Sequence, residues 1–64
     1  MQYTNSQIQA AIAEHIHVAW QRDACKLRFV DGLTYEQIAG KLGYSTQCIK
    51  EIIKRNKTIL FAHL

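Results

Sequence analysis

The sequence predicts an all-α fold, a bundle of four or five helices. Three observations point to it: the 64 residues contain no proline, apolar residues recur at spacings of three and four, and helix-capping residues bound several of these segments. With 48% hydrophobic and 20% charged residues, the composition is globular and excludes a disordered tail or a fibre. We expect one domain, residues 1–64, with helices at about 6–18, 22–31, 35–42 and 45–55, and a fifth helix if a C-terminal extension forms over 57–63.

The first predicted helix, residues 6–18, follows three residues of good N-cap type, Thr4, Asn5 and Ser6. Trp20 either closes this helix or begins the next. The apolar residues form one stripe at helical spacing: Ile8, Ala11, Ile12, Ile16 and Ala19.

The second predicted helix, residues 22–31, has an apolar face built from Ala24, Leu27 and Val30, with Cys25 and Phe29 beside it. It ends at Asp31-Gly32, because glycine adopts the left-handed conformation in which helices commonly terminate.

Leu33 is a connector, and Thr34 to Gln37 reads as a capping box that starts the helix over 35–42. That helix stops at Gly43, and Ser45 offers a fresh N-cap for the helix over 45–55. The inward residues of the two helices are Ile38, Ala39 and Leu42, then Cys48, Ile49, Ile52 and Ile53.

A short helix, a glycine-containing turn of about three residues and a capped second helix together indicate a helix-turn-helix. Ala39 stands where the helices would cross, and Gly43 can supply the positive φ of the turn. Further apolar residues hold the pair together: Ile38, Leu42, Tyr44, Ile49 and Ile52. An αα-hairpin with a purely structural role would share the pattern.

The net charge of +3 is concentrated in the C-terminal part of the chain. From Met1 to Gly40 three cations oppose four anions, a balance of −1, whereas from Lys41 to Leu64 five cations oppose one anion, a balance of +4. Such asymmetry indicates a nucleic-acid or acidic-membrane surface, or a solvated face. No stretch approaches the roughly 20 apolar residues of a membrane span, and Met1 to Ser6 lacks the charge of a signal peptide, so a cytoplasmic location is expected.

Cysteine and histidine spacing gives no support for a metal or catalytic site. We expect Cys25 and Cys48 to be reduced, buried hydrophobes, and His15 and His17 to lie at the rim or surface. The two cysteines and the three histidines, His63 included, do not have the spacing of zinc ligands. No cofactor is expected. The chain also lacks a glycine-rich phosphate loop, a nucleophile elbow and paired carboxylates, so we expect no enzyme.

Two stretches carry a resemblance to a known family: Asp31-Gly32-Leu33-Thr34-Tyr35-Glu36-Gln37-Ile38-Ala39 and Lys41-Leu42-Gly43-Tyr44-Ser45. They resemble bacterial sigma-factor region 4 and related regulators. The chain is also similar to small sigma-like proteins of phages and other mobile elements, in which an arginine-aspartate pair, here Arg22-Asp23, begins the preceding helix. The resemblance runs from Arg28 to Arg55 and implies sequence-specific binding to double-stranded DNA.

The second helix of the pair has a polar side formed by Gln47, Lys50, Glu51 and Lys54. Ser45, Thr46 and Gln47 would enter the major groove. There a glutamine amide can bond adenine twice, a threonine methyl can touch thymine, and Lys50 can read guanine. The carboxylate of Glu51 is repelled by phosphate unless it accepts from cytosine or pairs with Lys54 or Arg55.

Other candidates would position the protein on the DNA backbone. Lys54, Arg55 and Lys57 lie further along the helix, Lys41 lies near the turn, and backbone amides near Thr34 and Tyr35 start the preceding helix.

The last residues are apolar: Ile59, Leu60, Phe61 and Leu64. In an unbroken helix Asn56 would fall within the apolar stripe and Phe61 would point away from it. Either the helix breaks near 56–58 and folds back onto the first helix, or a partner covers Phe61. A homodimer through the first helix and this stretch would also place two reading helices about 34 Å apart.

These observations favour a transcriptional regulator of phage or mobile-element type. The first alternative is a protein-interaction module that docks on RNA polymerase or another regulator through Trp20, Tyr44, Phe61 and the basic face. The second is a phage DNA-packaging or recombination accessory protein.

Overall fold

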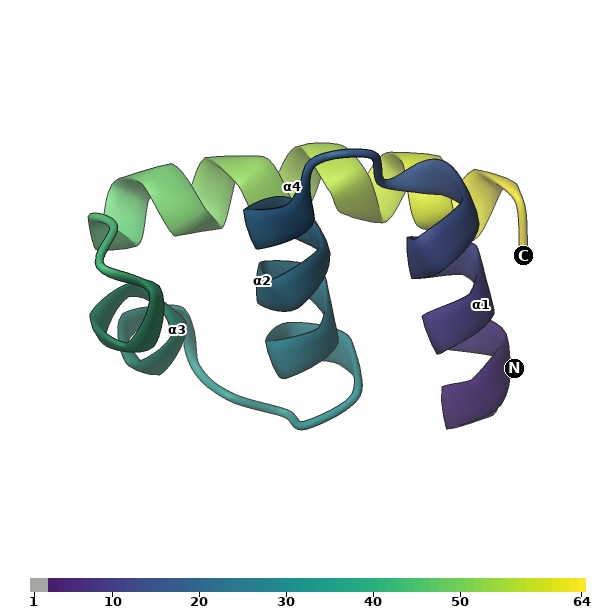
Figure 1. The fold of residues 1–64 in the computed structure, drawn as a ribbon, viewed down its shortest axis with the longest axis horizontal. Helices are drawn as coiled ribbons and strands as arrows, with labels where there is room; N and C mark the ends of the chain where they lie inside the picture. The colour runs from purple at the N-terminus through teal and green to yellow at the C-terminus, as the bar shows by residue number, and fades with distance from the viewer. Residues whose placement is uncertain (1–2) are drawn as a thin grey trace.

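Four helices account for most of residues 3–64, the part of the chain that this computed structural model describes. They are α1 (Asn5–His15), α2 (Ala19–Phe29), α3 (Tyr35–Leu42) and α4 (Thr46–Ala62). The long α4 crosses and contacts each of the other three, while α1 and α3 do not contact each other (Figure 1). The all-α prediction is confirmed, with no strand among the described residues. Met1 and Gln2, which begin the polar segment considered above, lie outside them.

Local capping explains where three of the helices begin. The amide of Gln37 donates to Thr34 Oγ1 at 3.2 Å, and the amide of Thr34 donates to Gln37 Oε1 at 2.9 Å, which is the predicted capping box. Thr4 and Gln7 make the same pair of bonds at α1, and the amide of Cys48 donates to Ser45 Oγ at α4. Each start is therefore fixed by residues within four positions of it.

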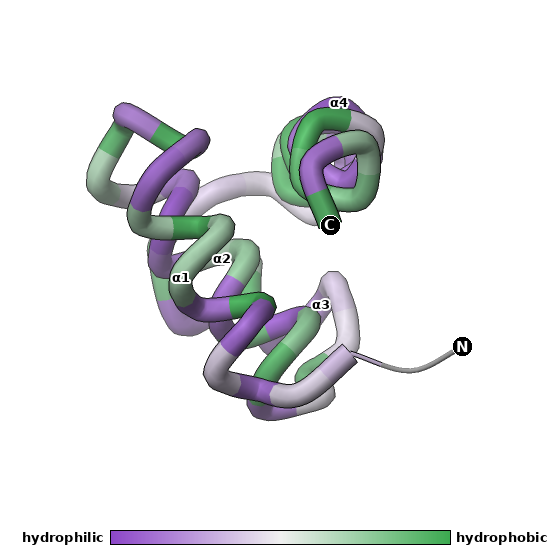
Figure 2. The backbone as a smooth tube through the Cα atoms, turned by 90° about the vertical axis from the view of Figure 1, so that its right-hand side faces the viewer, coloured by the Kyte–Doolittle hydropathy of each residue, from purple (hydrophilic) through white to green (hydrophobic). Residues whose placement is uncertain are grey.

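The core consists of two buried clusters that Phe29 joins, since its ring packs against both. The first lies between α1, α2 and the end of α4: Ile8, Ala11, Ile12, Ile16, Cys25 and Leu60. The second lies between α2, α3 and the first half of α4: Ala24, Ile38, Ala39, Ile49 and Ile53. In the view along α4, the other three helices lie to one side of it (Figure 2).

The boundary between the first two helices differs from the prediction. α1 ends at His15 rather than at residue 18, and α2 begins at Ala19 rather than at residue 22 and ends at Phe29 rather than at residue 31. Ile16 is extended at φ −105° yet stays buried, and its carbonyl accepts from Arg22 Nη1 at 3.0 Å. Trp20 therefore belongs to α2, and Ala19 is exposed rather than part of the stripe.

The break near residues 56–58, one of the two alternatives for the C-terminal stretch, does not occur, because α4 runs unbroken from Thr46 to Ala62, and residues 57–63 form no separate fifth helix. Asn56 lies 5% exposed within the apolar stripe, and its Nδ2 donates to Gln21 Oε1 at 3.3 Å. A partnered amide costs little to bury, so the stripe continues through it to Leu60. Ile59 lies outside the stripe and is 38% exposed.

Phe61 is covered within the chain. Its ring lies 5.5 Å from that of Tyr3, just before α1, and 5.7 Å from that of Phe29 in an edge-to-face arrangement. These two rings therefore cover Phe61, with neither a helix break nor a partner protein.

The two cysteines are free, with Cys25 buried and Cys48 half-buried. His17 is exposed, and His15 is half-buried at the rim of α1, where its ring stacks on His63 at 4.0 Å. Within residues 3–64 no group of three or more histidine, cysteine or acidic side chains is placed to hold a metal ion. None of the helices described is both long enough and apolar enough to cross a membrane.

Burial raises the pKa of the Cys25 thiol to about 11, and the hydrogen bond with Asn56 acts weakly in the opposite direction. Because the pKa is higher in the folded state, this thiol contributes stability fully below about pH 9, and the contribution is lost as the pH rises toward about 11. We expect the free energy of unfolding to fall between pH 8 and pH 10.5 by about 1 to 2 kcal/mol more in the wild type than in Cys25→Ala. Urea titrations at both pH values measure this difference, and equal losses in the two proteins would contradict it.

Candidate nucleic-acid interface

The turn between α3 and α4 is tight and is fixed by backbone geometry. Gly43 has φ +80° and ψ 27°, the left-handed conformation that the sequence predicted for it. The amides of Gly43 and Tyr44 both donate to the carbonyl of Ala39, at 2.9 and 3.1 Å. Two residues later the cap at Ser45 starts α4, so the two helices are joined rigidly.

Buried side chains of both helices hold α4 against α3. Ile38 and Ala39 from α3 lie in the same cluster as Ile49 and Ile53 from α4. Ile52, which the sequence placed on the inner side, is only half-buried. One side of α4 is thus clamped against the body of the protein.

The other side of α4 is polar and open to solvent. Its buried residues, at Ile49, Ile53, Asn56 and Leu60, share one face of the helix. The exposed residues of α4 include all those that the sequence assigned to DNA: Thr46, Gln47, Lys50, Glu51, Lys54, Arg55 and Lys57. Thr58, Ile59 and Ala62 are exposed further along the helix. Four cations and one anion therefore lie along the exposed surface of one helix.

At the start of α4 one polar side chain caps the helix and the next two face solvent. Ser45 uses its hydroxyl to accept from the amide of Cys48 at 3.2 Å, whereas Thr46 and Gln47 are exposed. Gln47 Nε2 donates to Glu51 Oε1 at 3.2 Å. Within the chain Glu51 therefore accepts from this glutamine, and the pairing with Lys54 or Arg55 that the sequence left open is not the contact present; the four-residue spacing of Gln47 and Glu51 was visible in the sequence.

At the start of α3 the capping box occupies the amides of Thr34 and Gln37. The intervening amides of Tyr35 and Glu36 belong to the first helical turn, which has no intrahelical acceptors for them. The guanidinium of Arg28 lies 4.6 Å from the centre of the Tyr35 ring, and its Nη1 donates to the carbonyl of Leu33. Sequence reasoning missed this cation, because Arg28 and Tyr35 stand on different helices.

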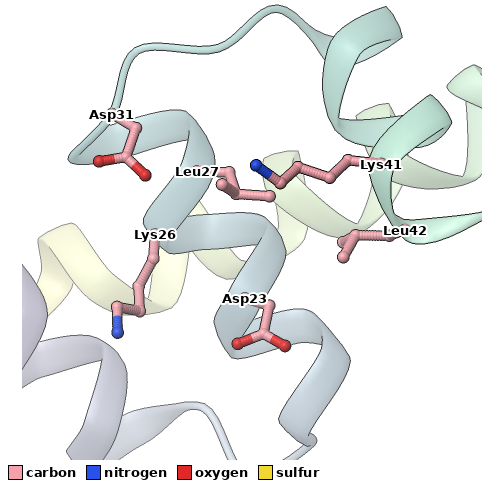
Figure 3. Close-up of a pocket in the computed structure, with 6 residues that line it drawn as sticks. All are labelled: Asp23, Lys26, Leu27, Asp31, Lys41 and Leu42. Carbon is pink, nitrogen blue, oxygen red and sulfur yellow. The ribbon is translucent and has the colours of Figure 1, made fainter.

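Lys41 lies apart from the cations of α4. It lines an open groove of about 310 Å³ between α2 and α3, whose walls also carry Asp23, Lys26 and Asp31 over Leu27 and Leu42. No residue of α4 lines the groove, and the Lys41 side chain extends across it toward Leu27 (Figure 3). The groove is a second polar surface, with two anions and two cations.

Trp20 and Tyr44 connect the turn to α2. Their rings stack with centres 4.3 Å apart, and Trp20 also packs against the second buried cluster. Tyr44 remains 40% exposed, so it supports the turn from the outside and does not fill the space between α3 and α4.

Comparison with known protein families assigns the chain to a family. The model of the family described as Sigma-70, region 4 matches residues 20–56, more than half of the chain. The match covers most of α2, all of α3 and the part of α4 up to Asn56, and leaves α1 outside it. The comparisons with curated proteins and with solved structures gave no match.

Proposed function

Because this chain belongs to the sigma-70 region 4 family, whose members are DNA-binding helix-turn-helix domains, we propose that it is a sequence-specific regulator of transcription, of the type found in phages and mobile elements. In this proposal Ser45 to Arg55 enters the major groove of double-stranded DNA. The observation that carries it is the outer side of α4, which is polar, cationic and exposed while the inner side is clamped.

The exposed residues divide into those that read bases and those that bind the backbone. Gln47 would bond adenine, Thr46 would touch thymine and Lys50 would read guanine. Phosphates would be bound by Lys54, Arg55 and Lys57, and by the free amides at Tyr35 and Glu36 with Arg28 beside them. Lys41 would join them only by turning out of its groove.

Selection of bound duplexes from a random pool tests the proposal directly. We expect enrichment of a defined motif a few base pairs long, because several exposed donors and acceptors face the groove together. A pool that shows no enrichment after repeated rounds would contradict sequence-specific binding.

Two alanine substitutions on α4 should have different effects. We expect Gln47→Ala to relax the preference at one base pair, where a good bidentate contact is worth about 1 to 3 kcal/mol, with a smaller loss of overall affinity. Lys54→Ala should weaken binding to all sequences alike, because phosphate carries no sequence information. Both side chains are exposed, so neither change should disturb the fold. Affinities for the selected duplex and its single-base variants measure both effects, and wild-type affinity and preference in both mutants would contradict the assignment.

The groove between α2 and α3 favours a second role, docking on RNA polymerase or another protein. It lies away from α4, and its two leucines lie among charges of both signs. A protein bound there would leave the outer side of α4 free for DNA, so the two roles are compatible.

A homodimer is the last part of the proposal. Since Phe61 is packed within the chain, a second copy would have to bury the exposed Ile59 and Leu64 at the end of α4. A palindrome in the selected duplexes, with half-sites about 34 Å apart, would support this arrangement.

A further inference from the structure

We propose that Gln47 and Glu51 act as one reading unit, in which Glu51 fixes the orientation of the Gln47 amide and itself accepts a hydrogen bond from a cytosine close to the adenine that Gln47 reads. This inference rests on the proposed function and assigns Glu51 two tasks, positioning its neighbour and selecting a second base. The observation behind it is the bond from Gln47 Nε2 to Glu51 Oε1, at 3.2 Å on the exposed side of α4.

Gln47 is available for this unit because of where it stands in its helix. Gln7 and Gln37 occupy the third helical position of α1 and α3, where their side-chain oxygens turn back to cap the helix at 2.9 Å. In α4 the third position is Cys48, and Gln47 is the second residue. Its amide is therefore free of the cap and turns forward to Glu51.

An acceptor-only partner determines which way round the amide lies. A carboxylate can bond the NH₂ group of a glutamine but not its oxygen, so Glu51 orients the Gln47 nitrogen toward the following turn. One N–H and the oxygen of the amide then remain unbonded. This donor and acceptor match the N7 acceptor and the N6 amino donor of adenine.

The second carboxylate oxygen of Glu51 is not used by the bond with Gln47 and can accept a hydrogen bond from the DNA. Near phosphates its charge is unfavourable unless a donor from the groove compensates it, and the cytosine amino group is the major-groove donor that a carboxylate pairs with. Four residues of helix advance about 6 Å, and base pairs are spaced about 3.4 Å apart along the duplex. The cytosine should therefore lie one or two base pairs from the adenine.

The test compares wild type, Glu51→Gln and Gln47→Ala in selection from a random pool, followed by affinity measurements on single-base variants of the selected duplex. Thr58→Ala is the matched control, because Thr58 is exposed further along α4 and is not part of the Gln47–Glu51 pair. We expect the wild type to prefer adenine and cytosine, each by about tenfold. Gln47→Ala should lose the adenine preference and keep that for cytosine, whereas Glu51→Gln should lose the cytosine preference and weaken that for adenine to about threefold. Thr58→Ala should keep both.

Glu51→Gln keeps the shape of the side chain and removes its charge. It therefore also distinguishes base recognition by Glu51 from simple repulsion between its carboxylate and the DNA phosphates. If it raised affinity for every sequence and left both preferences unchanged, Glu51 would be only a repulsive charge and the inference would be overturned. Failure of the wild type to bind any duplex would overturn the proposed function itself. Circular dichroism of each variant checks that the helices are intact.

Discussion

Ile49→Ala is expected to unfold a large part of the protein population in plain buffer. Ile49 is fully buried between α3 and α4, and truncating a buried isoleucine to alanine costs about 2 to 5 kcal/mol. A core of this size rarely supplies more than about 3 to 5 kcal/mol in total. The loss is therefore comparable to the whole stability, and urea titration followed by circular dichroism should show it.

Ile59→Ala is the matched control for this substitution. Ile59 lies on the same helix but is 38% exposed and belongs to neither buried cluster. Its truncation should change the free energy of unfolding by no more than about 0.5 kcal/mol, as for most surface positions. Equal effects of the two substitutions would mean that α4 is not clamped as described.

The second large effect is on DNA binding and comes from salt. Lys54, Arg55 and Lys57 on α4, with Arg28 near the start of α3, can neutralise about four phosphates. This gives a slope of about −3.6 for the logarithm of the binding constant against the logarithm of salt concentration. The binding constant should then fall about 150-fold between 50 and 200 mM salt. Fluorescence anisotropy with a labelled duplex measures the slope.

Two lysine substitutions check where this salt dependence originates. Lys57→Ala should make the slope less negative by about 0.9, the contribution of one phosphate contact. Lys26→Ala removes the same charge from the groove between α2 and α3 and should leave the slope unchanged. A slope near zero in the wild type would indicate a mainly apolar contact instead.

Features that depend on neighbouring residues were predictable from the sequence. The capping box at Thr34, the left-handed Gly43 and the cap at Ser45 each involve residues within four positions, and all three are present. These local signals fix the geometry of the α3–turn–α4 unit and therefore the exposed side of α4. The interface candidates follow from them, apart from Arg28, which reaches Tyr35 from another helix.

Features that depend on distant contacts were not predictable. Whether the helix continues through Asn56 was left open because its partner Gln21 stands 35 positions away, and Phe61 looked uncovered because Tyr3 and Phe29 come from other segments. The end of α1 was missed for a different reason. No glycine or proline marks the change of direction after His15, and Ile16 stays buried in phase with the helix although its backbone is extended.

The central claim is that the exposed side of α4 is the surface that meets DNA. Its most direct test is a titration of isotope-labelled protein with a selected duplex, following the backbone amide signals by NMR. We predict that the largest shifts fall at Tyr35 and Glu36 and from Ser45 to Arg55, with small changes at Asp23 and Asp31 in the groove between α2 and α3. Shifts concentrated at the groove, with those of α4 unmoved, would contradict the account.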